Sequence, residues 1–116
     1  MPPSTTFSFL VVAPDYMDAD ASKRRNDAKD SHIEHMGKFG KAGILRAGGG
    51  MLPADNYDFS SGAKVTGSFM IFEAESIEAV KQIIEEDIFW TQSVWDHEKL
   101  QIIPFYSPLP IPPLMS

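Results

Sequence analysis

The chain has 116 residues, 43% of them hydrophobic, and its 16 acidic and 10 basic residues give a formal net charge of -6 at pH 7. This length fits a single domain over residues 1–116, and an acidic chain without a basic cluster argues against nucleic acid as a partner. The sequence has no cysteine, which excludes disulfide bonds, thiolate nucleophiles and cysteine-ligated metal sites.

The sequence shows no pattern for membrane insertion or export. The segment 1–6 lacks the charged stretch and apolar run of a leader peptide, and no apolar run is long enough to cross a bilayer. We therefore expect a soluble cytoplasmic protein with no membrane partner.

The first two predicted elements are a strand and a long helix. Apolar side chains occupy both faces of residues 7–12, which is typical of an inner strand. Over residues 21–42, small and apolar residues and one histidine recur every three or four positions, which predicts an amphipathic helix. These positions are Ala28, His32, Met36 and Phe39. We expect Gly43 to end this helix.

The middle of the chain predicts two strands joined by a long loop. The second strand covers residues 44–51, and we expect the glycine run 48–50 to interrupt it, to form a bulge or to let the backbone approach a ligand closely. A polar loop follows over residues 53–64, and long loops of this kind often cover sites. The third strand covers residues 65–74. Its alternation places three residues on one face: Ser68, Met70 and Phe72.

The last third of the chain predicts a helix, an apolar corner and a fourth strand. Ser76 is a suitable N-cap for a helix that ends near Asp87. Residues 88–90 form the apolar corner, and residues 100–105 form a strand whose proline places its end near a sheet edge. The prolines of the tail, residues 107–116, exclude helix and central strand.

The element order βαββαβ predicts a ferredoxin-like α+β fold. Right-handed crossovers arrange this order into a four-stranded antiparallel sheet with two helices on one face. The opposite sheet face also carries large apolar residues, and such a face needs cover. We therefore expect a homodimer that forms through this sheet face.

His32 is the main chemical candidate, because imidazole has an unperturbed pKa near neutrality and can transfer protons without a cofactor. A histidine on an apolar helix face is more often hydrogen-bonded to a carbonyl, and the residues alone favour that interpretation. His35 lies one turn further along, a spacing that can hold a metal, but no further ligands follow at a matching spacing. We predict no metal and no cofactor, and we expect His35 to line a cleft or to pack.

Three other polar residues each have a functional and a structural interpretation. Asp87 is a helix-end turn residue that binds backbone amides unless it faces His32, where it would orient the imidazole. Ser68 donates a hydrogen bond to a substrate oxygen or is a small residue packed beside a helix. Arg46 is a partner for a substrate oxyanion or a solvent-facing member of an ordinary salt bridge.

Several large side chains are candidates to line a pocket for an aromatic ligand, although such residues more often form core or dimer contacts. The residues assigned to substrate binding, besides His35 and Arg46, are Phe39, Met70, Phe89 and Trp90. The glycine run 48–50 lacks the flanking residues of phosphate-binding loops, which disfavours nucleotide binding.

A larger set of residues recurs in a specific order and spacing along the chain. These residues are His32, Gly43, Leu45 and Ala47-Gly48; Gly67-Ser68, Glu73 and Ser76; Asp87 and Phe89; and Val94, His97 and Pro104-Phe105. In this order and spacing the sequence resembles the YCII-related (YciI-like) proteins of the dimeric α+β barrel superfamily, and the resemblance covers most of the chain. Three positions depart from the usual pattern, namely Lys29, Gly49 and Ile88.

The resemblance implies a sheet-paired homodimer with a cleft between sheet and helices, where a histidine and an aspartate match His32 and Asp87. Related enzymes catalyse cofactor-free eliminations, dehydrochlorinations or isomerisations of oxygenated ring compounds. The expected function is therefore that of a cofactor-independent lyase or isomerase, of dehydratase or elimination type, acting on a small cyclic or polyketide-like substrate. The alternative is a noncatalytic protein that uses the same barrel for small-ligand binding or assembly.

Overall fold

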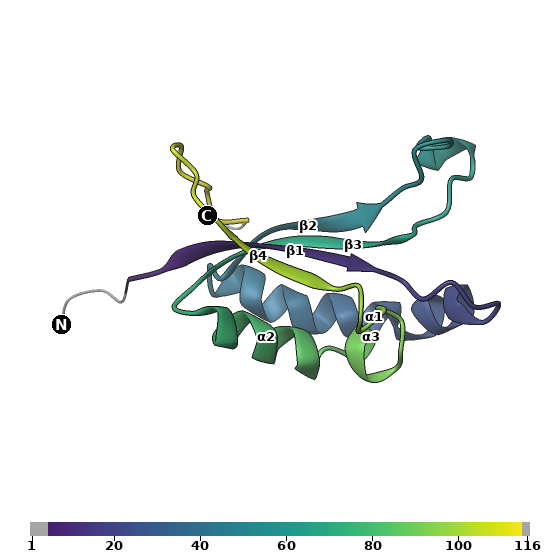
Figure 1. Ribbon diagram of the computed structural model, residues 1–116, viewed down its shortest axis with the longest axis horizontal. Coiled ribbons are helices and arrows are strands. Elements are labelled where there is room, and N and C mark those ends of the chain that lie inside the picture. Colours follow the sequence, from purple (N-terminus) through teal and green to yellow (C-terminus); the bar gives the residue numbers. More distant parts are fainter. Residues whose placement is uncertain (1–4, 115–116) are drawn as a thin grey trace.

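The computed structural model describes residues 5–114 and contains a four-stranded antiparallel sheet with helices on one face. The elements in chain order are β1 (Phe7–Pro14), α1 (Ala21–Lys41), β2 (Leu45–Met51), the 3-10 turn η1 (Phe59–Ser61), β3 (Gly67–Ala74), α2 (Ile77–Glu86), α3 (Ile88–Thr91) and β4 (Gln101–Phe105). The strands lie in the order β2-β3-β1-β4, with α1, α2 and α3 below the sheet in Figure 1. The predicted ferredoxin-like α+β fold is confirmed.

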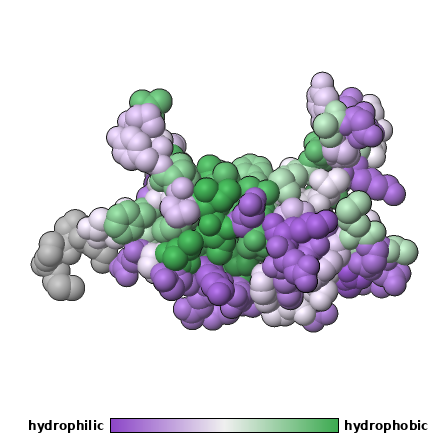
Figure 2. Space-filling view, viewed as in Figure 1, coloured by the Kyte–Doolittle hydropathy of each residue, from purple (hydrophilic) through white to green (hydrophobic). Residues whose placement is uncertain are grey.

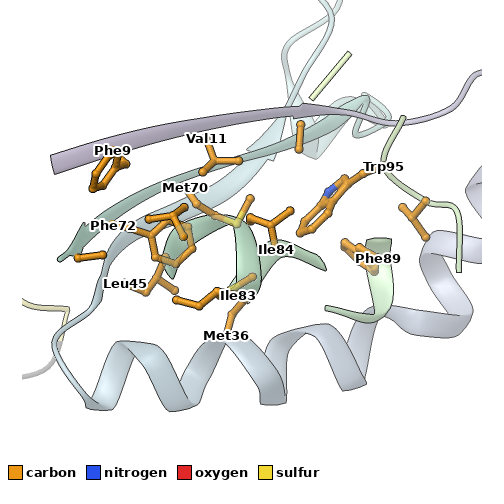
Figure 3. Packing of buried hydrophobic residues seen from close by; sticks show 14 of the residues in the cluster. Phe9, Val11, Met36, Leu45, Met70, Phe72, Ile83, Ile84, Phe89 and Trp95 are labelled. Carbon is orange, nitrogen blue, oxygen red and sulfur yellow. The ribbon is translucent and has the colours of Figure 1, made fainter. Parts of the chain in front are cut away.

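The core forms between the sheet and the helices, because the side chains along each of the two central strands alternate between the two faces of the sheet. Phe9 lies opposite Phe72, and Val11 lies opposite Met70, so all four side chains share the face that meets the helices. All four are buried. Figure 3 shows the Phe9 and Phe72 side chains at one end of the core and Trp95 at the other.

The two longer helices cover this face with their apolar stripes. On α1 the buried residues include Ala28 and Met36, as the spacing in the sequence predicts. The Oγ atom of Ser76 accepts a hydrogen bond from the amide of Ala79 and caps α2, also as predicted. Gly43 follows α1 with a positive φ of 78°, which explains why the helix stops there.

The expected interruption of the second strand is wrong. Gly48, Gly49 and Gly50 pair in continuous register with β3, and the register instead shifts between Leu45 and Ala47. The space beside the run is nevertheless limited, because a Cβ atom on Gly49 would lie 2.9 Å from a ring carbon of Phe69. Glycine is therefore needed to make room for a neighbouring side chain and leaves the strand intact. Close approach of a ligand to this backbone stays a prediction.

The sheet face opposite the helices, called the open face below, is apolar and lies between two projecting segments. Its half-buried or exposed side chains include Leu10, Val12, Phe69, Ile71 and Ile103. The loop between β2 and β3 and the segment after β4 both rise above this face in Figure 1, and Figure 2 shows hydrophobic residues between them. None of the helices over residues 5–114 is both long enough and apolar enough to cross a membrane.

Candidate active site

Asp87 is a fully buried carboxylate at the junction of two helices. It ends α2 and caps α3, and its Oδ1 atom accepts a hydrogen bond of 2.8 Å from the amide of Phe89. Its side chain is 0% exposed. The interpretation of Asp87 as a turn residue that binds a backbone amide therefore describes one of its contacts.

Two histidines of α1 reach the same carboxylate. The Nδ1 atom of His32 lies 2.9 Å from Oδ1 and 3.0 Å from Oδ2 of Asp87, and the Nδ1 atom of His35 lies 2.8 Å from Oδ2. Because a carboxylate only accepts, these contacts place a hydrogen on Nδ1 of each ring. The other nitrogen of a neutral imidazole is then an acceptor.

The ring of His32 is held in one orientation by aromatic neighbours. It stacks on Phe89 with centroids 3.9 Å apart and an interplanar angle of 8°. The indole of Trp95 meets it edge-on, with centroids 5.5 Å apart. Such packing fixes the ring plane, so the direction of Nε2 is set by the fold as well as by Asp87.

A second polar network lies beside this group and was not predicted from the sequence. Arg25 forms a double hydrogen bond with Asp15, at 2.6 and 2.9 Å, and its Nη2 atom also donates to Oγ of Ser68 at 2.9 Å. The indole Nε1 of Trp95 donates to the same Oγ atom at 3.0 Å. The guanidinium of Arg25 also lies 4.7 Å from the ring centroid of Phe89.

The two networks meet at a cavity of about 380 Å³ between α1 and the β2–β3 pair. Arg25, His32 and Ser68 supply its polar lining, and Met70 and the run Gly48–Gly50 lie on the strand side. A cavity of this size is in the range that holds a small organic ligand. It presents an imidazole, a hydroxyl and a guanidinium to the same ligand.

The structure brings only some of the residues assigned to substrate binding to this cavity. Met70 lines it, Phe89 lies beneath His32, and His35 contacts Asp87 and the ring of Phe39 instead. Trp90 stacks on His97 with centroids 3.7 Å apart, and both line a different cavity. Over residues 5–114, no group of three or more histidine, aspartate or glutamate side chains is arranged to hold a metal ion.

Arg46 lies away from the cavity, contrary to its assignment. Its Nε atom donates to the carbonyl of Gly43, and its Nη1 atom donates to the carbonyl of Ile111, each at 2.5 Å. The guanidinium therefore binds backbone carbonyls and is turned to the segment after β4. The position of Arg46 does not support a role in binding a substrate oxyanion.

The spacing of Arg25 and His32 in the sequence could have indicated that Arg25 belongs to the site. It stands two helical turns before His32, so the helical period places both side chains on the same face of α1. It is the last of three consecutive basic residues, Lys23, Arg24 and Arg25, which made it resemble part of a solvated charged face. Its contacts with Asp15, Ser68 and the Phe89 ring distinguish it from the other two, and these partners are distant in sequence.

Comparisons with known proteins agree with this architecture. The sequence pattern of the YCII-related domain matches residues 9–106. Fusaric acid biosynthesis protein 2 of Gibberella fujikuroi is 36% identical over 99 residues, which cover 85% of this chain and 92% of that protein. The protein of the same name from Gibberella moniliformis is 35% identical over 99 residues, with the same coverage of 85% and 92%.

A solved structure extends the comparison to an enzyme with a bound ligand. The 5-chloro-2-hydroxyhydroquinone dehydrochlorinase TftG of Burkholderia phenoliruptrix AC1100, in complex with 2,5-dihydroxybenzoquinone, resembles this fold with a TM-score of 0.70. The two sequences are 25% identical, and the match covers 85% of this chain and 93% of TftG. The similar proteins thus include a small-molecule enzyme and a biosynthesis protein.

Proposed function

The chain belongs to the YCII-related domain family, and on that premise we propose that it is a cofactor-independent lyase or isomerase, of dehydratase or elimination type, acting on a small cyclic or polyketide-like substrate. His32 is the proton-transfer group, Asp87 orients it, and Ser68 donates a hydrogen bond to a substrate oxygen. The cavity beside α1 is the substrate site.

The contact between His32 and Asp87 is the observation that carries this proposal. A buried carboxylate that accepts from Nδ1 fixes the tautomer and stabilises the imidazolium formed after proton transfer. The hydrogen bonds of the described residues leave Nε2 of His32 without a partner, and His32 lines the cavity. An unprotonated nitrogen is thereby available to a ligand.

Ser68 and Arg25 supply the complementary donors. Arginine and the tryptophan indole only donate hydrogen bonds, so their contacts with Oγ of Ser68 use its lone pairs and leave its hydrogen for another acceptor. A hydroxyl polarised by a guanidinium is suited to an oxygen that gains negative charge during the reaction. Such an oxygen arises when a proton leaves a carbon next to a carbonyl.

These groups are sufficient for an elimination. Nε2 of His32 takes a proton from a carbon next to a carbonyl or enol group, and the electron pair of that C–H bond forms a new double bond. The bond to chloride or hydroxide on the adjacent carbon breaks. The imidazolium then protonates the departing hydroxide to give water, or releases its proton to solvent when chloride departs.

The size of the cavity and the names of the relatives support the proposed substrate class. A cavity of about 380 Å³ accommodates a substituted ring. TftG is named for the dehydrochlorination of a chlorinated hydroxyhydroquinone and was solved with a dihydroxybenzoquinone. An oxygenated ring would place one oxygen at Ser68 while a ring or side-chain carbon faces His32.

Chloride release from 5-chloro-2-hydroxyhydroquinone and deuterium incorporation from D2O into a panel of hydroxylated rings test the proposal. We expect the wild-type protein to support at least one of these reactions without added cofactor. His32→Gln should lower the rate by about 10²–10⁴-fold, the usual contribution of a positioned acid or base. His35→Gln is the matched control, because His35 also contacts Asp87 but does not line the cavity. The rate of this variant should fall less than that of His32→Gln.

Binding of 2,5-dihydroxybenzoquinone without any reaction that depends on His32 would contradict the proposed chemistry. That outcome would instead favour a noncatalytic protein that binds small ligands. Equal rate losses in His32→Gln and His35→Gln would also contradict the assignment, because they would show that both changes act through Asp87 rather than through a base in the cavity.

A further inference from the structure

We propose that the segment 107–114, called the strap below, brings Leu114 to one wall of the substrate cavity, and that Arg46 anchors this segment. This inference rests on the proposed function only in taking the cavity as the ligand site. The strap would determine which ligands the cavity accepts, whether or not the protein is a catalyst. The match to the YCII-related domain ends at residue 106. The strap is therefore an addition of this chain to the matched part of the fold.

The strap crosses the end of the sheet. It follows β4 at one edge, and its residues Ser107, Leu109, Pro110 and Ile111 border a cavity of about 300 Å³. The other residues of that cavity are Ser8, Glu73 and Arg46, which lie on β1, β3 and β2 respectively. The strap thus passes over all three remaining strands and reaches the β2 edge, beside which the substrate cavity lies.

Arg46 holds the strap at that edge. The register of the β2–β3 pair shifts at Arg46, and its guanidinium binds the carbonyl of Gly43 with one nitrogen and the carbonyl of Ile111 with another. Hydrogen bonds from a charged donor are stronger than those between neutral groups. One side chain therefore joins the turn after α1 to the strap.

The far end of the strap reaches the substrate cavity. Leu114 lines this cavity together with Gly37 and Ile33 of α1. A Cβ atom added at Gly40 would lie 3.7 Å from Cδ1 of Leu114, so the leucine side chain lies beside this glycine of the helix. The cavity is bordered there by a half-exposed side chain that comes from outside the part of the chain matched by the family pattern.

The composition of the strap lowers the conformational entropy that is lost when it becomes ordered. Its four prolines restrict the backbone in the unfolded chain, so less conformational freedom is lost when the strap packs against the rest of the protein. These prolines are Pro108, Pro110, Pro112 and Pro113. A stiff segment with one anchor at Ile111 can hold Leu114 over the helix without a further strand or helix. The prolines that exclude regular structure thus support a fixed wall.

Chemical modification of His32 by diethyl pyrocarbonate, followed by peptide mass spectrometry, tests the strap directly. We expect Arg46→Gln and Leu114→Ala each to accelerate modification of His32 severalfold relative to the exposed His97, because the cavity opens at the strap. Leu109→Ala is the matched control: it removes a leucine from the same segment that does not line the substrate cavity. Lys29→Gln controls for the loss of a positive charge.

The same variants should weaken binding of 2,5-dihydroxybenzoquinone, measured by titration calorimetry, while Leu109→Ala and Lys29→Gln should not. Unchanged modification rates of His32 in both Arg46→Gln and Leu114→Ala would contradict the proposed role of the strap, whatever the protein catalyses. Faster modification in both variants, combined with no reaction that depends on His32, would support the strap and reject the proposed function.

Discussion

The Nδ1 atom of His32 lies 2.9 Å from Oδ1 of Asp87, although 55 residues separate them in the chain. The contact exists because α1 packs against the short helix α3, whose N-cap is Asp87. The carboxylate thus has two roles: it caps a helix with one hydrogen bond and orients an imidazole with others. The helix junction and the candidate catalytic group are parts of the same structure.

Replacement of Asp87 by asparagine separates these roles. Asparagine is also a good N-cap, so α3 should survive, but its single carbonyl oxygen cannot accept from the amide of Phe89 and from both Nδ1–H groups, and its NH2 group only donates. We expect the reaction rate to fall by about 10²–10⁴-fold, because the amide no longer holds the His32 imidazole in the tautomer with its hydrogen on Nδ1. The free energy of unfolding should fall by about 1–3 kcal/mol, because buried polar groups lose partners.

Steady-state kinetics and urea unfolding of Asp87→Asn measure these two effects. Asp96→Asn is the matched control, because Asp96 also accepts from a nearby backbone amide, that of Glu98, but does not contact either histidine of α1. Full activity in Asp87→Asn would show that the carboxylate serves only the helix.

Removal of the Ser68 hydroxyl tests the donor side of the site. Ser68→Ala leaves the buried indole nitrogen of Trp95 and one donor of Arg25 without their acceptor, which should cost about 1–3 kcal/mol of folding stability. Loss of a donor to a developing oxyanion should lower kcat by about 10²–10³-fold. Kinetics at saturating substrate, compared with Ser8→Ala on the open face, would show whether kcat or only KM responds.

The open face of the sheet should form the dimer interface. Ile71 lies on β3 at its centre, paired with Leu10 of β1. A lysine in place of Ile71 would put a charge inside an apolar contact, so Ile71→Lys should be a monomer by analytical ultracentrifugation. Ile77→Lys, at an exposed position at the start of α2, should sediment as the wild-type protein does. A wild-type protein that sediments as a monomer would refute the predicted interface.

Much of this fold could be predicted because each element carries its own local pattern. The spacing of Ala28 and Met36 predicted the buried face of α1, and Ser76 predicted the start of α2. The continuous pairing of Gly48–Gly50 could not be predicted, because it depends on the space that Phe69 and Val65 occupy beside the strand. Glycine has no side chain that would reveal such a neighbour.

The candidate site was harder to predict than the fold because its contacts join distant segments. The helical period places Arg25 and His32 on one face of α1, but only the register of β3 brings Ser68 beneath Arg25. Arg46 was assigned to the site from its residue type and strand position, whereas a register shift turns it toward Ile111. Residue type therefore identified candidates, and long-range packing selected among them.

Nitrogen-15 NMR of the protein labelled at its histidines reports on the proposed proton-transfer group itself. We expect the His32 imidazole to carry its hydrogen on Nδ1, and we expect 2,5-dihydroxybenzoquinone to shift the resonance of its Nε2 atom while the His97 resonances stay unchanged. A His32 ring with its hydrogen on Nε2, or a ligand that binds without moving either nitrogen resonance of His32, would show that His32 does not present an acceptor nitrogen to the cavity.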